Sequence, residues 1–268
     1  MKRLPALLVL ITLLLTGCGS AAPAVTGERI TEGPEEIALA LSEKYQVQIL
    51  VGTDAASAEP WDYSFTPEED SALLLAQLET VDQCLRNYPE GMLKVLADDC
   101  GGLTICLVKK ISGKENNGGL ASARGLQFRD RENQPYLAIA EDLEYTLYHE
   151  LTHVIEDFVL PRSQAWDQWE DLNPLSFDYD MDFEKNLHRD GAMYLGDANR
   201  CFIDTYSMSF PREDRARIME YAMTEGNRSL FSSPMMQEKL NVLSMGIREA
   251  FSLTDSRGSY CWEQYLMQ

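Results

Sequence analysis

One pattern in the sequence combines residue types and a spacing that suit metal-dependent chemistry: His149-Glu150-Leu151-Thr152-His153. The chain contains only three histidines, so two of them at this spacing are not expected by chance. On a helix, residues four apart lie on one face, and their imidazoles can therefore converge on a single ion. Glu150 stands where its carboxylate can take a proton from a water molecule at that ion. The pattern predicts a hydrolytic metal site.

A zinc site needs a third protein ligand, and three residues compete for that role. Glu156 lies on the same helix face as the histidines, but a straight helix carries it about 10.5 Å along the axis from His149, which favours a supporting or surface role. His188 follows in an irregular segment and is the weaker alternative. Glu213 is the stronger candidate, because Pro211 can begin a helix and acidic residues are favoured in a first turn.

The segment around Glu213 also resembles a known group, the gluzincin metallopeptidases related to anthrax lethal factor and to the pro-pro endopeptidases. These proteins share a tyrosine followed seven residues later by a glutamate at the start of a helix, and Tyr206 and Glu213 have this spacing. Ala216 stands where the group has a small residue, whereas Arg217 stands where it often has a second glutamate. The resemblance implies that Glu213 is the third zinc ligand and that Tyr206 stabilises the transition-state oxyanion. Arg217 leaves open which residue supports the ligands.

The elements that must position these residues follow from the hydrophobic periodicity. Leu143, Leu147, Leu151, Val154 and Phe158 repeat at helical spacing and predict a helix from Asp142 to Val159. The preceding half alternates helices with short strands, and the following half is mostly helical around an irregular segment between Arg162 and Gly196. We expect helices at 34–44 and 67–87, strands at 47–51, 103–111, 121–128 and 136–140, and a helix beginning at Pro211.

This order predicts an α+β fold in which a small mixed sheet is followed by the HExxH helix and a helical C-terminal half. By the resemblance, the fold is a zincin-like domain over residues 28–268, with an αβ half at 28–140 and a helical half at 141–268 that carries the metal site. The predicted cofactor is Zn²⁺, bound by His149, His153 and Glu213.

The N-terminal residues have the features of a targeting segment. Lys2 and Arg3 precede an apolar run from Leu4 to Leu15, which is shorter than the about 20 residues that span a bilayer. The run ends in Leu15-Thr16-Gly17-Cys18, which resembles a bacterial lipobox. The resemblance implies a lipoprotein signal peptide at 1–17, lipidation of Cys18, and a tether at 18–27. The alternative is an ordinary signal peptide with a chance cysteine.

Composition and charge narrow the possible functions. The chain has 268 residues, of which 45% are hydrophobic, enough for a globular core and too few for a polytopic membrane protein. Its formal net charge of −20 speaks against nucleic-acid binding, which depends on positive charge. Five cysteines remain after Cys18, and they are either reduced or partly paired; the sequence does not give a connectivity.

Together these features predict a zinc metallopeptidase that is lipid-anchored to the bacterial cell membrane outside the cytoplasm. Glu150 is its expected general base and Tyr206 its oxyanion donor. A peptide or protein substrate could add as a strand along residues 121–127. The alternative is a surface-anchored binding protein that retains a zincin scaffold without turnover; an intact Glu150 beside intact ligands favours the enzyme. The oligomeric state and the cleavage preference are left open.

Overall fold

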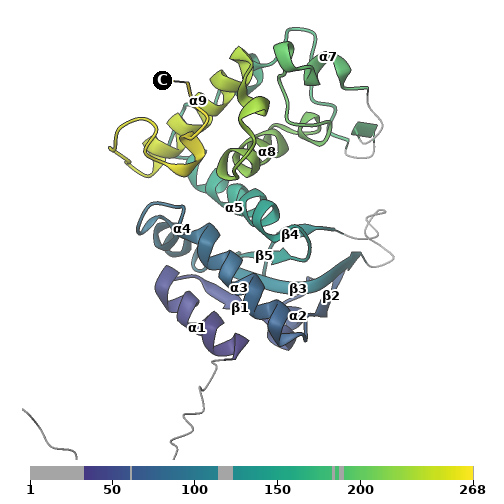
Figure 1. Cartoon of the computed structure of the whole chain (residues 1–268), viewed down its shortest axis with the longest axis vertical. Coiled ribbons are helices and arrows are strands. Elements are labelled where there is room, and N and C mark those ends of the chain that lie inside the picture. The colour runs from purple at the N-terminus through teal and green to yellow at the C-terminus, as the bar shows by residue number, and fades with distance from the viewer. Residues whose placement is uncertain (1–32, 61, 114–122, 183–184, 187–189, 268) are drawn as a thin grey trace, which may run out of the picture. The chain divides into compact units, whose positions relative to one another are not determined.

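The structure is a computed structural model that describes residues 33–60, 62–113, 123–182, 185–186 and 190–267 (Figure 1). The predicted signal peptide, the tether with Cys18, and His188 lie outside these residues. Within them, no helix is both long enough and apolar enough to cross a membrane. The described residues contain five cysteines, and all five are free thiols.

The first half is built around a small mixed sheet, as the sequence predicted. Its strands are β1 (Gln48–Leu50), β2 (Tyr63–Pro67), β3 (Thr104–Gly113), β4 (Gly125–Arg129) and β5 (Pro135–Ile139). Strands β1, β3, β5 and β4 are neighbours in that order, and β2 also pairs with β3. The β1–β3 and β3–β5 pairs are parallel, whereas β2–β3 and β4–β5 are antiparallel. Among the described residues β4 pairs as a strand only with β5, so it forms an edge of the sheet.

Helices α1 (Pro34–Tyr45), α2 (Gly52–Ser57), α3 (Ser71–Leu85) and α4 (Met92–Cys100) belong to the same half. Helix α3 corresponds to the helix predicted at 67–87, and the predicted start at Pro67 is wrong, because Pro67 ends β2. The helix begins after Asp70, whose carboxylate accepts hydrogen bonds from the backbone N–H groups of Ala72 (2.9 Å) and Leu73 (3.1 Å). The sequence prediction also missed β2, α2 and α4, which are too short to show a clear period.

Helix α5 (Leu143–Val159) joins the sheet to the helical half. Figure 1 shows it between strands β4 and β5 on one side and helices α8 (Pro211–Met223) and α9 (Pro234–Ala250) on the other. Thirteen of its seventeen residues are buried, so it is covered on nearly all sides. Shorter elements complete this half, and they are α7 (Ala192–Leu195), η1 (Trp169–Leu172), η2 (Asp197–Asn199), η3 (Tyr206–Met208), η4 (Arg228–Phe231) and η5 (Cys261–Glu263).

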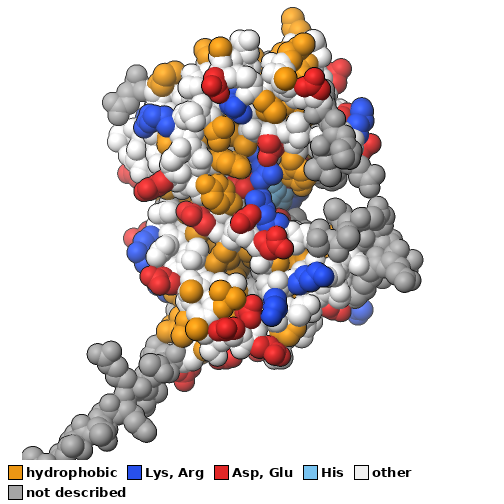
Figure 2. Space-filling model, turned by 45° about the vertical axis from the view of Figure 1, so that its right-hand side comes forward, with side chains coloured by type: hydrophobic (Ala, Val, Ile, Leu, Met, Phe, Trp, Pro, Cys, Tyr) orange, Lys and Arg blue, Asp and Glu red, His pale blue; other side chains and the backbone are white. Residues whose placement is uncertain are grey.

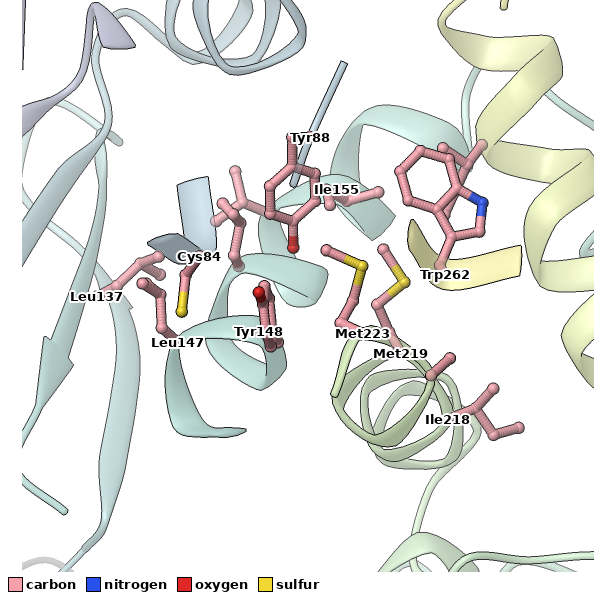
Figure 3. Close-up of a cluster of buried hydrophobic side chains, with 14 of the residues drawn as sticks. Cys84, Tyr88, Leu137, Leu147, Tyr148, Ile155, Ile218, Met219, Met223 and Trp262 are labelled. Carbon is pink, nitrogen blue, oxygen red and sulfur yellow. The ribbon is translucent and has the colours of Figure 1, made fainter. Parts of the chain in front are cut away.

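The main core is continuous across α5. Figure 3 shows Leu147 facing Leu137 of the sheet, while Tyr148 and Ile155 lie beside the Met219 and Met223 side chains of α8. All of these residues are at most 2% exposed. Because apolar packing fixes α5 against both the sheet and α8, it also fixes the distance between residues that these elements carry.

Candidate metal centre

Helices α5 and α8 bring His149, His153 and Glu213 together. Their possible ligand atoms all lie within 4.8 Å of one another, and the three side chains are buried. The Nε2 atoms of His149 and His153 lie 3.1 Å and 3.7 Å from the same oxygen, Oε2 of Glu213. This buried group can therefore hold a metal ion. No other cluster of three metal-ligating side chains with this geometry occurs in the described part of the chain.

Glu213 reaches the histidines because of where α8 begins. Pro211 takes the first helical position after Phe210, which places Glu213 in the first turn. Burial favours the protonated carboxyl, but the hydrogen bond with His149 and the histidine charges outweigh burial and lower the pKa of Glu213 to about 2. Glu213 is thus held as a carboxylate, the form that binds cations.

Glu220 orients His149, and the sequence analysis did not identify it. Its Oε2 lies 3.0 Å from Nδ1 of His149, and the residue is fully buried. A carboxylate on Nδ1 favours a proton there, so that loss of the other ring proton leaves the Nε2 lone pair directed at the cluster. The available signal was the spacing: Glu213 and Glu220 are seven residues apart and therefore share one face of α8.

Arg217, which departs from the resembled group, is the partner of this carboxylate. Its Nη1 donates to both oxygens of Glu220, at 2.9 Å and 2.8 Å. Its guanidinium also lies over the ring of Tyr206, 5.1 Å from the centroid. The carboxylate that supports the ligands is therefore present, three residues later in the helix than the resemblance suggested.

His153 has a different partner on Nδ1, the guanidinium of Arg212. The Nε–H of Arg212 donates to this nitrogen at 2.9 Å, and Nη1 of Arg212 lies 3.4 Å from Oδ1 of Asp157. A neutral histidine that accepts on Nδ1 carries its proton on Nε2. Binding a cation through Nε2 therefore requires His153 to move its proton to Nδ1 and Arg212 to give up this hydrogen bond. Asp157 and Gln127 then remain as partners of Arg212.

Glu150 lies beside the cluster and against the edge strand. A Cβ atom on Gly125 of β4 would come within 2.8 Å of Oε1 of Glu150 and 2.3 Å of Cγ2 of Thr146, so only glycine permits this approach. Burial raises the pKa of Glu150 to about 7, more than the nearby positive charge of His149 lowers it. A carboxylate with this pKa is suited to accept and return a proton near neutral pH.

Tyr206 of η3 lies on the other side of the cluster, with its ring centroid 6.1 Å from that of His149. Burial, and then the negative charge of Glu213, raise the pKa of its hydroxyl. Tyr206 is therefore a hydrogen-bond donor over the whole physiological pH range, and Glu213 is one of its hydrogen-bond partners.

Glu156 is not part of the cluster. Both of its oxygens accept hydrogen bonds from Arg215, at 3.2 Å and 2.8 Å, in a buried pair. In place of the expected supporting or surface role, Glu156 forms a buried ion pair between α5 and α8. His188, the other candidate ligand, lies outside the described residues.

The cluster opens into a cleft of about 460 Å³ between the edge of the sheet and α8. One wall is residues 123–127, and the other includes Tyr206, Arg212 and Arg217. Figure 2 shows histidine at the bottom of a hollow with basic side chains beside it. Strand β4 therefore forms part of the lining of the cleft in which the cluster lies.

Comparison with protein-family models, with curated proteins and with solved structures finds no match to this chain. Its function must therefore be inferred from the residues of the cleft.

Proposed function

We propose that this protein is a zinc-dependent metallopeptidase with a gluzincin-like site. The observation that carries the proposal is the buried cluster of two imidazoles and a carboxylate with Glu150 beside it. Nitrogen ligands from two histidines and an oxygen from glutamate are the donor set of many catalytic zinc sites. Glu220 holds a proton on Nδ1 of His149, so His149 reaches the tautomer that such binding needs when its Nε2 proton is released, and His153 reaches it when Arg212 withdraws.

In this proposal each residue of the cleft has one task. Bound zinc would polarise a peptide carbonyl and lower the pKa of water. Glu150 takes the proton from the attacking water and returns it to the leaving amine, a role that suits its raised pKa. The protonated hydroxyl of Tyr206 donates to the developing oxyanion. Glu220 keeps Nδ1 of His149 hydrogen-bonded throughout.

The edge of β4 that pairs with no strand among the described residues supports a peptide as the substrate. An extended chain can add to an exposed strand through main-chain hydrogen bonds, and β4 runs along the cleft beside Glu150. Substrate along residues 125–127 would then lie within reach of the general base. Residues 121–122 of the predicted substrate strand are outside the described part of the chain.

The test is metal content together with hydrolysis of an unfolded protein by the full chain purified in detergent. We expect about one zinc per chain. His153→Ala and Glu213→Ala should lose the metal, whereas Glu156→Ala should keep it. Loss of zinc in Glu156→Ala with retention in Glu213→Ala would refute the ligand set.

Two further variants separate binding from chemistry. Glu150→Ala should keep zinc and lose hydrolysis, while Glu144→Ala, an exposed acid on the same helix, should keep both. Tyr206→Phe should keep zinc and lower kcat by about 10²–10³, because one oxyanion donor is lost. A zinc-loaded wild-type protein that hydrolyses no unfolded protein would instead favour a binding protein on this scaffold.

We also propose that the protein is exported and anchored by lipid on Cys18. The support is the sequence Leu15-Thr16-Gly17-Cys18 after a short apolar run. Cys18→Ala should release the protein from the membrane fraction or block its processing. Unchanged membrane association and unchanged electrophoretic mobility would contradict the anchor.

A further inference from the structure

The accessible charges in the cleft are mostly positive, although the protein as a whole is strongly acidic. Arg124 and Arg212 line the cleft with side chains that are 30% and 35% exposed. The carboxylates beside the cluster are largely covered: Glu150 and Glu213 are each 8% exposed, and Glu220 is 0% exposed. Asp142 beside Arg124 and Asp157 beside Arg212 have side chains that are 68% and 33% exposed, but neither residue lines the cleft. In a chain of net charge −20, the most exposed charged groups that line this cleft are therefore guanidinium groups.

The two arginines stand on either side of the metal centre. Arg212, at the beginning of α8, donates to Oε1 of Gln127 in β4 at 3.1 Å. Arg124 donates to Glu220 at 3.0 Å. Glu220 follows Arg212 by eight residues on α8, which corresponds to about 12 Å along the helix axis. His149 contacts both Glu213 and Glu220, so the cluster lies between these two points. An extended peptide covers about 12 Å in three to four residues.

Both guanidiniums keep donors for a further acceptor. Glu220 carries one negative charge and contacts Arg217 and His149 as well as Arg124, so it does not neutralise Arg124 alone. The other carboxylate near Arg124, Asp142, is 3.7 Å away and 68% exposed. Arg212 donates through Nε to His153, a contact that the metal-binding tautomer of His153 releases. Its ion pair with Asp157 is long, at 3.4 Å, and Asp157 also pairs with Arg129 at 2.6 Å, so Asp157 does not neutralise Arg212 alone.

We propose that the substrate is an acidic peptide with a carboxylate side chain on each side of the scissile bond, one bound by Arg124 and the other by Arg212. Planar guanidinium groups match carboxylates in paired hydrogen bonds, which fixes the peptide in register along β4. This inference rests on the proposed function, because it assigns the substrate of the same site.

The experiment measures peptide binding separately from hydrolysis. Zinc-saturated Glu150→Gln protein is titrated with three sets of fluorescent octapeptides. The first set carries two glutamates three or four positions apart, and the other two sets carry glutamines or lysines at the same two positions. We expect the glutamate peptides to bind at least about tenfold more tightly than the glutamine peptides, the scale of a charge-assisted hydrogen bond. Arg124→Gln and Arg212→Gln, each added to Glu150→Gln, should each remove most of this preference.

The control is Arg131→Gln, which changes the net charge equally but alters an exposed arginine outside the lining of the cleft. It should leave the preference unchanged, and Arg124→Lys, which retains the charge, should keep part of it. Equal binding of glutamate and glutamine peptides, tighter binding of lysine peptides, or an equal effect of Arg131→Gln would overturn the inference.

Hydrolysis by the wild-type protein distinguishes this inference from the function on which it rests. Cleavage of the glutamine and glutamate peptides at equal rates would retain the peptidase and overturn the acidic preference. Arginine-dependent binding of the glutamate peptides without cleavage of any peptide would support the recognition and overturn the peptidase.

Discussion

Glu156 and Glu213 are both buried carboxylates at the interface of α5 and α8, and they differ in what lies opposite them. Glu156 faces the guanidinium of Arg215, which hydrogen-bonds both of its oxygens and lies 5.3 Å from the ring centroids of both Trp166 and Trp169. Glu213 faces the nitrogens of His149 and His153. The first carboxylate has a permanent cation within the protein, whereas the second has imidazoles and the hydroxyl of Tyr206, none of which is a permanent cation.

The difference determines which group is open to a metal ion. Burial lowers the pKa of His149, but its hydrogen bonds with Glu213 and Glu220 outweigh burial and raise that pKa to about 9. A proton on His149 thus supplies the charge that Arg215 supplies to Glu156. A metal ion can replace that proton, since metal binding to histidine releases protons. A buried acid therefore indicates a metal site only when its neighbours are themselves ligands.

The same contrast is repeated along one turn of α8. Glu213, Asp214 and Arg215 are consecutive, and about 100° of rotation per residue sends them to three different partners. Asp214 accepts hydrogen bonds from Lys239 (2.7 Å), Tyr179 (2.7 Å) and Trp169 (3.1 Å). The charges of Asp214 and Arg215 are thus neutralised by partners inside the protein. These contacts hold in place the helix turn that directs Glu213 at the histidines.

The largest expected effect on stability comes from breaking the buried ion pair between Glu156 and Arg215. Arg215→Met leaves Glu156 buried without its cation, and we expect a loss of about 3–5 kcal/mol in the free energy of unfolding. For a chain of this size that lowers Tm by about 10 °C, measured by thermal unfolding. The double variant Glu156→Leu/Arg215→Met removes both charges and should be more stable than Arg215→Met. A double variant as unstable as the single one would show that packing, and not the charge, matters.

A smaller effect should follow when the cluster of His149, His153 and Glu213 loses the carboxylate of Glu220. Glu220→Gln removes the negative charge beside Nδ1 of His149, and we expect zinc affinity to fall by about 10–100-fold while the fold is retained. Competition with a chelator measures this affinity. Glu225→Gln, an exposed substitution shortly after α8, is the matched control. Unchanged affinity in Glu220→Gln would show that Glu220 serves only to pair with Arg124 and Arg217.

The smallest effect concerns Glu263 of η5, a carboxylate that, like Glu156, has its partners within the protein. Burial raises its pKa, but hydrogen bonds from Arg248, Ser244 and the backbone of Gly258 outweigh burial and lower it from 4.5 to about 2. Because the folded state holds the proton less tightly than the unfolded state, this group stabilises the fold above pH 4.5, and the contribution is lost as the pH falls toward 2.

Urea unfolding of the metal-free protein between pH 6 and pH 2.5 checks this expectation. Glu263→Gln should be less stable than wild type at pH 6, and the difference should shrink as the pH approaches 2.5. Glu238→Gln, an exposed substitution on α9, should leave the profile unchanged. A constant difference at all pH values would assign the effect of Glu263→Gln to hydrogen bonding alone.

The sequence by itself was sufficient where the signal is local. The HExxH spacing placed both histidines on one helix face, and the apolar period predicted α5 to within one residue of its start. The α+β class and the small mixed sheet were also predicted correctly, whereas β2, α2 and α4 were missed because their five to nine residues show no reliable period. Glu213 was placed near the start of a helix by Pro211, which acts through the local backbone.

Only the tertiary structure decided how the charged residues are paired. Glu156 and Glu213 are both acids on helices, and no local pattern states that Arg215 faces one and two imidazoles face the other. Glu220 on Nδ1 of His149, Arg212 on Nδ1 of His153 and Gly125 against Glu150 likewise join residues that are far apart in the chain. These contacts depend on how apolar packing sets α5 against α8 and β4, which is a property of the whole core and not of any one segment.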